Sequence, residues 1–103
     1  MVIRIENSNN VDVEITGSEL NYNLNYKITP KGTSKKVNFS VSEGEELVKS
    51  TVTCGCTSVL DMTKSSFAIN YNENRIGAIN QQVTLTFKSG KQVKIRLSGH
   101  INN

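Results

Sequence analysis

The sequence has little of what most enzymes and membrane proteins require. Its 103 residues include one histidine, two cysteines and no tryptophan. No apolar run approaches the roughly 18 residues of a membrane-spanning helix, which argues against a helical membrane protein. The first residues also lack the apolar segment of a secretory signal. We therefore expect synthesis in the cytoplasm without a signal peptide.

Known catalytic motifs are missing as well. The chain has no Gly-x-Ser-x-Gly, no His-Glu-x-x-His and no glycine-rich phosphate loop. With a single histidine, any Ser–His or Cys–His pair would depend on His100, and acids such as Asp61 and Glu73 are scattered on turns. We predict no enzymatic activity, no catalytic residues and no cofactor.

Period-two alternation of apolar and polar residues dominates the chain. It indicates half-buried strands, because successive side chains of a strand point to opposite faces. The alternating runs are residues 11–15, 20–28, 37–41, 67–71, 83–87 and 93–97. Turn residues separate them, and no helical periodicity is present. The pattern predicts one domain over residues 1–103, an all-β, immunoglobulin-like sandwich of about seven or eight antiparallel strands.

The last two runs predict a hairpin of defined register. A two-residue Ser89-Gly90 loop would mix core and solvent faces, whereas a three-residue loop over residues 88–90 pairs Leu85 with Val93 and Val83 with Ile95. That loop requires Gly90 to adopt a positive φ.

The two cysteines stand close together in Cys54-Gly55-Cys56-Thr57, after a strand-like run. In the reducing cytoplasm we expect free thiols, with Cys54 pointing to the core as a small apolar side chain if the strand is unbroken. Gly55 predicts a bulge or a backbone conformation that other residues avoid. Thiol redox chemistry is the alternative, although a lowered thiol pKa needs a helix N-terminus or a close cation.

A metal site is a further alternative for the same cysteines. Structural zinc needs four ligands, and Cys54 and Cys56 supply two at unusually short spacing. His100 and Asp61 are the remaining candidates, and His100 lies far along the chain. We therefore predict no metal.

The C-terminal hairpin carries a group of cations that could form an interaction face. These are Lys88, Lys91, Lys94 and Arg96, on the turn and the polar face of two strands. Such a face suits phosphates or an acidic protein. Nucleic acid is not favoured, because strong binders make roughly 6 to 10 phosphate contacts and offer aromatic platforms. A net charge of +3 is modest for that role.

Residues 37–101 resemble a bacterial domain-of-unknown-function family with a Cys-Gly-Cys-Thr signature, which is similar to Hydin-type and major-sperm-protein-type immunoglobulin-like domains. The matching features are Glu43-Gly44, Cys54-Gly55-Cys56-Thr57, the run 67–71, Gly77, Ser89-Gly90 and residues 95–99. The proline common beyond the signature is missing. The resemblance implies a non-enzymatic binding or scaffolding role and supplies no catalytic residues.

An immunoglobulin-like domain made in the cytoplasm needs a protein partner there. We therefore expect a structural or binding module, such as a phage capsid decoration or another virion accessory protein, with possible self-association through strand edges. The alternatives are a thiol redox or metal-binding protein using Cys54 and Cys56, or an adaptor that binds a peptide by strand addition.

Overall fold

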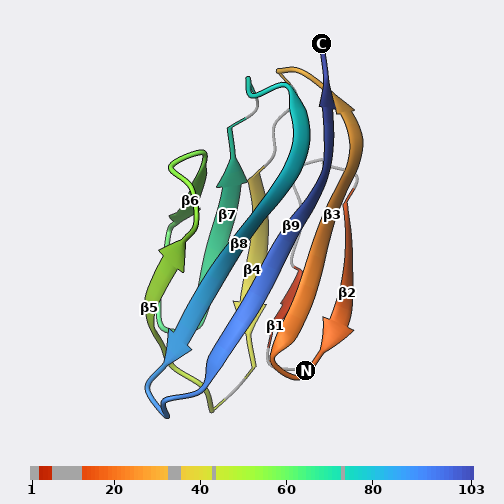
Figure 1. Cartoon of the computed structure of the whole chain (residues 1–103). Helices are drawn as coiled ribbons and strands as arrows, with labels where there is room; N and C mark the ends of the chain where they lie inside the picture. The colour runs from red at the N-terminus through yellow and green to blue at the C-terminus, as the bar shows by residue number, and fades with distance from the viewer. Residues whose placement is uncertain (1–2, 6–12, 33–35, 43, 73) are drawn as a thin grey trace.

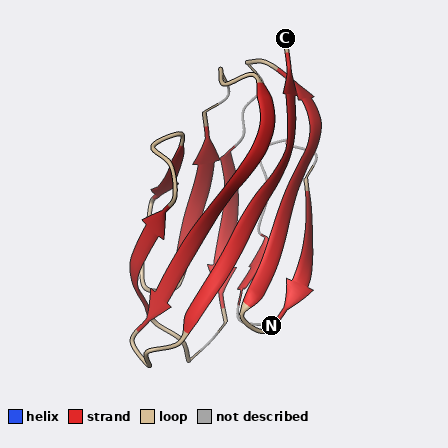
Figure 2. Ribbon diagram, viewed as in Figure 1, coloured by secondary structure: helices blue, strands red, loops and turns tan. Residues whose placement is uncertain are grey.

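The structure, a computed structural model, describes residues 3–5, 13–32, 36–42, 44–72 and 74–103. These residues form strands joined by turns, and none of them is helical (Figures 1 and 2). The strands are β1 Ile3–Ile5, β2 Glu14–Ser18, β3 Asn21–Pro30, β4 Lys36–Val41, β5 Leu47–Val52, β6 Thr57–Leu60, β7 Ser66–Tyr71, β8 Gly77–Phe87 and β9 Gln92–Asn102. No helix in this described part is suited to crossing a membrane.

The strands form two packed sheets, which confirms the predicted all-β sandwich. One sheet has the order β1-β4-β7-β6 and the other β2-β3-β9-β8-β5 (Figure 1). The described strands number nine rather than seven or eight, because the short β1 and β6 are both present. They are also not all antiparallel, since β3 runs parallel to β9. The N-terminal strand β1 joins its own molecule by pairing with β4.

One core fills the space between the sheets. Alternate residues of the long strands point into it, including Tyr22, Leu24 and Tyr26 on β3 and Phe39 on β4. Burial raises the pKa of the Tyr26 phenol above its ordinary value, and neighbouring Tyr71 raises it further. The phenol therefore stays neutral and acts as a core side chain.

The β8–β9 hairpin has the predicted register. Leu85 pairs with Val93 and Val83 with Ile95. The Phe87 N–H donates to the Lys91 carbonyl over 2.9 Å, which closes a three-residue loop over residues 88–90. Gly90 adopts a φ of 91°. Both predictions for this hairpin are confirmed, because turn geometry and face alternation require the same pairing.

The predicted strand over residues 20–28 is interrupted by a bulge. Asn25 pairs with Ser98 and Ile28 with His100, so two residues of β3 lie opposite Gly99 alone. Lys27 has a φ of 59°, and its N–H donates to Asn25 Oδ1 over 2.8 Å. The extra residue reverses the alternation. Ile28, expected in the core, is therefore 71% exposed.

The strand predicted over residues 11–15 appears further along the chain. β2 begins at Glu14 and continues through the residues expected to form a turn, as far as Ser18. Residues 11 and 12 lie outside the described residues. β2 pairs with β3 and forms one edge of the five-stranded sheet.

Candidate functional site

The outer face of the five-stranded sheet carries rows of polar side chains. Alternation sends every second residue of each strand to this face, and pairing aligns them across the strands. One row joins Thr16 on β2, Asn23 on β3, Arg96 on β9 and Gln82 on β8. The next row places Asn21 beside Lys94.

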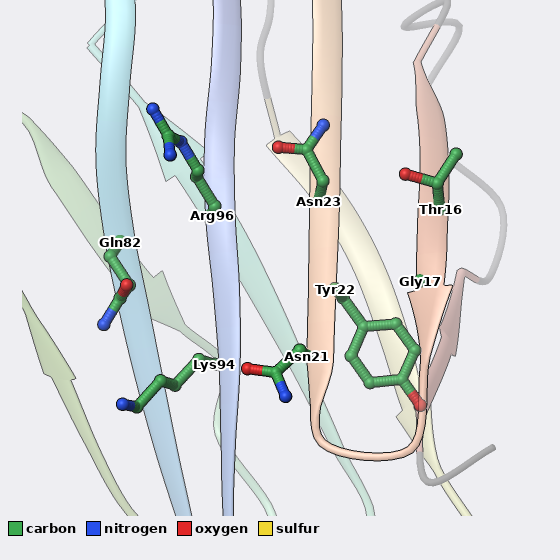
Figure 3. Close-up of a pocket in the computed structure, with 8 residues that line it drawn as sticks. All are labelled: Thr16, Gly17, Asn21, Tyr22, Asn23, Gln82, Lys94 and Arg96. Carbon is green, nitrogen blue, oxygen red and sulfur yellow. The ribbon is translucent and has the colours of Figure 1, made fainter.

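A hollow of about 340 Å³ lies on this face. Figure 3 shows the two cations on β9, with Asn21 and Asn23 on β3 and Gln82 on β8. The lining residues are Thr16, Gly17, Asn21, Tyr22, Asn23, Gln82, Lys94 and Arg96. We call this the cationic hollow. None of its lining residues is acidic.

Two hydrogen bonds hold the polar groups of the cationic hollow. Arg96 Nη2 donates to Asn80 Oδ1 over 3.0 Å, and Asn23 Nδ2 donates to Ser98 Oγ over 3.1 Å. Lys94 and Arg96 make no ion pair within the described part of the chain. Two cations thus stand together at the surface, and the guanidinium keeps further N–H donors for a ligand.

The structure divides the predicted interaction face into two pairs. Lys91 Nζ lies 3.1 Å from Glu45 Oε1, and Lys88 Nζ lies 3.8 Å from Glu46 Oε2. These two lysines are therefore partly neutralised at the hairpin tip. Lys94 and Arg96, in contrast, line the cationic hollow.

The prediction of free thiols is wrong. Cys54 and Cys56 form a disulfide, and the described residues contain no free cysteine. β5 ends at Val52, and the chain then turns, with the Thr57 N–H donating to the Cys54 carbonyl over 3.1 Å. The turn brings the two Cα atoms within 5.2 Å, which is inside the range for a disulfide.

The environment of the turn also differs from the expectation. The strand ends before Cys54, which is half-buried and packs against the core, whereas Cys56 is itself a buried core residue. Gly55 does not have a positive φ, and a Cβ atom there would meet nothing within 4 Å. Gly55 also lies in the turn between β5 and β6 and not within a strand, so it forms no β-bulge, and both forms of the prediction for Gly55 are wrong. No other feature of the structure explains a glycine at this position.

Breaking the disulfide should cost a modest amount of stability. The bridge spans a single intervening residue, so in the chain-entropy model it removes little freedom from the unfolded chain. We expect the Cys54→Ala/Cys56→Ala variant to lose about 1.5 to 2 kcal/mol in the free energy of unfolding, measured by urea denaturation. Reductant added to the wild-type protein is the control and should produce most of the same loss. If neither the variant nor the reduced wild-type protein lost stability, the disulfide would not stabilise the fold.

The remaining metal candidates are not brought together. The described residues contain no group of three or more His, Cys, Asp or Glu side chains placed to hold a metal ion. His100 is exposed on β9, paired with Ala78 and Ile28. Asp61 instead accepts a hydrogen bond from Lys36 Nζ over 2.9 Å.

Strand addition remains a prediction, and the structure identifies the edges it would use. The sheets end at β1 and β6, and at β2 and β5. On β5, Val48 is 52% exposed and Val52 39% exposed. An added strand on β5 would therefore cover apolar surface.

Most residues of the cationic hollow were not predicted as site residues. In the sequence, Asn21 and Asn23 are polar positions of an alternating run, and Gln82 directly precedes another such run. Asn21 and Asn23 meet Lys94 and Arg96 because β3 lies parallel to β9, whereas Gln82 meets Arg96 across the β8–β9 hairpin. Nothing local in the sequence indicates a pairing of strands about 70 residues apart.

In comparisons with known proteins, no family model matches this chain, and no curated protein matches it significantly.

Proposed function

We propose that this chain is a non-enzymatic binding module that attaches to a protein assembly through the outer face of its five-stranded sheet. The setting we expect is a phage virion, as a capsid decoration or accessory protein. The observation that carries the proposal is the cationic hollow. It exposes Lys94 and Arg96 without an ion-pair partner in the described structure, among amide and hydroxyl groups.

The chemistry of the hollow supports binding over turnover. Its side chains are amides, a hydroxyl, a guanidinium, an ammonium and a buried phenol. Acid–base and nucleophilic catalysis mostly use histidine, carboxylate or an activated thiol within reach of the substrate, and none of these lines the hollow. Amides and cations hold a partner by hydrogen bonds and charge.

The strand order supports an immunoglobulin-like arrangement for the module. In immunoglobulin constant domains one sheet has the order A-B-E-D and the other contains C-F-G. The orders β1-β4-β7-β6 and β5-β8-β9 follow the same sequence of neighbours. β2 and β3 then extend the second sheet beyond β9. Domains of this architecture serve many functions, so the virion setting is an argument by analogy.

Removing the charge of the hollow should release the chain from the assembly. Phage particles purified on a density gradient from cells that make the chain should carry it. With Lys94→Ala/Arg96→Ala we expect the particle-bound fraction to fall roughly tenfold, because each exposed ionic contact contributes up to about 1 kcal/mol. Quantitative immunoblotting of the gradient fractions measures the bound chain.

The matched control removes the same charge from the other half of the hairpin. Lys88→Ala/Lys91→Ala should leave the particle-bound fraction nearly unchanged, because these lysines already face Glu46 and Glu45. If the wild-type chain were absent from the purified particles, the proposed attachment to a phage particle would be wrong. If the particle-bound fraction fell equally in the two variants, binding would depend on the net charge of the chain and not on the cationic hollow.

A further inference from the structure

The outer face also carries an apolar zone beyond the cationic hollow. The bulge in β3 turns Ile28 outward, and Ile28, His100 and Ala78 form one row across β3, β9 and β8. All three are exposed, and Ile28 is 71% exposed. We call the surface of Ile28 and Ala78, which flank His100 in this row, the apolar zone.

The bulge makes this zone part of the same face as the hollow. Without the extra residue, Ile28 would continue the alternation of Tyr22, Leu24 and Tyr26 and point to the core. Bulges commonly redirect a side chain beside a functional site. The exposure of Ile28 is therefore a consequence of the bulge in the β3 backbone.

The spacing between the two zones is set by β9. From His100 to Arg96 is four residues, or about 13 Å along a strand, and Lys94 lies about 7 Å further. A partner that covers both zones must therefore present an apolar group at that distance from its anionic groups.

The chemistry of the two zones selects the partner. A guanidinium and an ammonium without an acidic neighbour in the hollow suit carboxylates. The amides of Asn21, Asn23 and Gln82 offer both donors and acceptors, as peptide groups require. A nucleic acid would supply anions but gains little from Ile28, and the one aromatic residue of the hollow, Tyr22, is buried and offers no stacking platform.

We infer that the outer face binds an acidic protein segment, with carboxylates at Lys94 and Arg96 and an apolar side chain on the apolar zone. This inference rests on the proposed function, because it names the chemistry of the partner at the same face. It does not depend on the partner being a phage particle.

Synthetic peptides test the inference on the isolated full chain. The probe is a seven-residue peptide with leucine at its first position, glutamate at its fifth and seventh, and serine or threonine elsewhere, made also in the reverse order. These positions reproduce the spacing from His100 to Arg96 and Lys94. Control peptides replace both glutamates by glutamine or the leucine by serine.

Backbone amide shifts measured by NMR on isotopically labelled protein report both affinity and location. We expect shifts at Lys94, Arg96 and Gln82 together with Ile28 and Ala78. The glutamine peptide and the Lys94→Ala/Arg96→Ala variant should each bind about tenfold more weakly. The serine peptide and an Ile28→Asn variant should bind about fivefold more weakly. Lys88→Ala/Lys91→Ala should bind like the wild type.

Three results would overturn the inference. The first is no shift with either peptide order at 5 mM, roughly the limit of weak binding. The second is equal affinity for the glutamate and glutamine peptides. The third is tighter binding of an eight-nucleotide thymidine oligomer that Ile28→Asn leaves unchanged, which would indicate a general polyanion site. Peptide binding without association with particles would retain this inference and refute the virion setting alone.

Discussion

Replacing Gly99 with alanine should destabilise the fold by about 3 kcal/mol or more. Gly99 has a φ of 131°, where other residues are strained, and it lies opposite the β3 bulge. A Cβ atom at this position would lie 2.8 Å from the Lys27 carbonyl oxygen and 3.0 Å from the Lys27 nitrogen. Both neighbours are backbone atoms in a paired strand, so they cannot move aside without loss of the bulge.

Thermal unfolding followed by circular dichroism measures this effect. For a domain of this size, about 3 kcal/mol corresponds to a fall of roughly 15 °C in Tm. The matched control is Gly90→Ala, which also changes a glycine of positive φ (91°) but has nothing within 4 Å of the new Cβ. We expect about 1 kcal/mol for the control. If the two variants lost equal stability, the contact with Lys27 would not be the cause.

Replacing Phe39 with alanine should cost about 3 to 5 kcal/mol. Phe39 on β4 pairs with Phe67 on β7, and both rings are buried. The rings are stacked, with centroids 4.9 Å apart and planes 8° from parallel. Removal of one ring deletes apolar contacts and leaves a cavity against the other. A loss of this size is a large part of the stability of a small domain.

The midpoint of urea unfolding, with the slope checked for two-state behaviour, measures this loss. Phe39→Leu is the graded control, because it keeps most of the apolar volume and should cost only about 1 to 1.5 kcal/mol. Equal effects of alanine and leucine would mean that the site relaxes around the missing ring, and that the stacked pair does not hold the four-stranded sheet together.

Local features of the fold were predictable from the sequence. The β8–β9 hairpin is the clearest case, because its alternating residues and Gly90 lie within about 20 residues of each other and require one register. The all-β class follows from the same alternation repeated along the chain. No long-range information was needed for either prediction.

The features that were missed depend on contacts between distant residues. Ile28 leaves the core because Gly99, remote in sequence, allows two residues of β3 to lie opposite it. The hollow requires β3 to align with β9, and the disulfide requires a turn at the end of β5. Alternation specifies which residues share a face of one strand, but it does not specify which strands become neighbours.

The parallel pairing of β3 with β9 also governs when the molecule can fold. β9 lies between β3 and β8, so the five-stranded sheet has a gap until residues 92–102 emerge from the ribosome. A sheet closed by strands so distant in sequence forms slowly, since a long loop must be ordered before its contacts form. Until β9 joins them, the backbone N–H and C=O groups along the facing edges of β3 and β8 therefore have no partner strand.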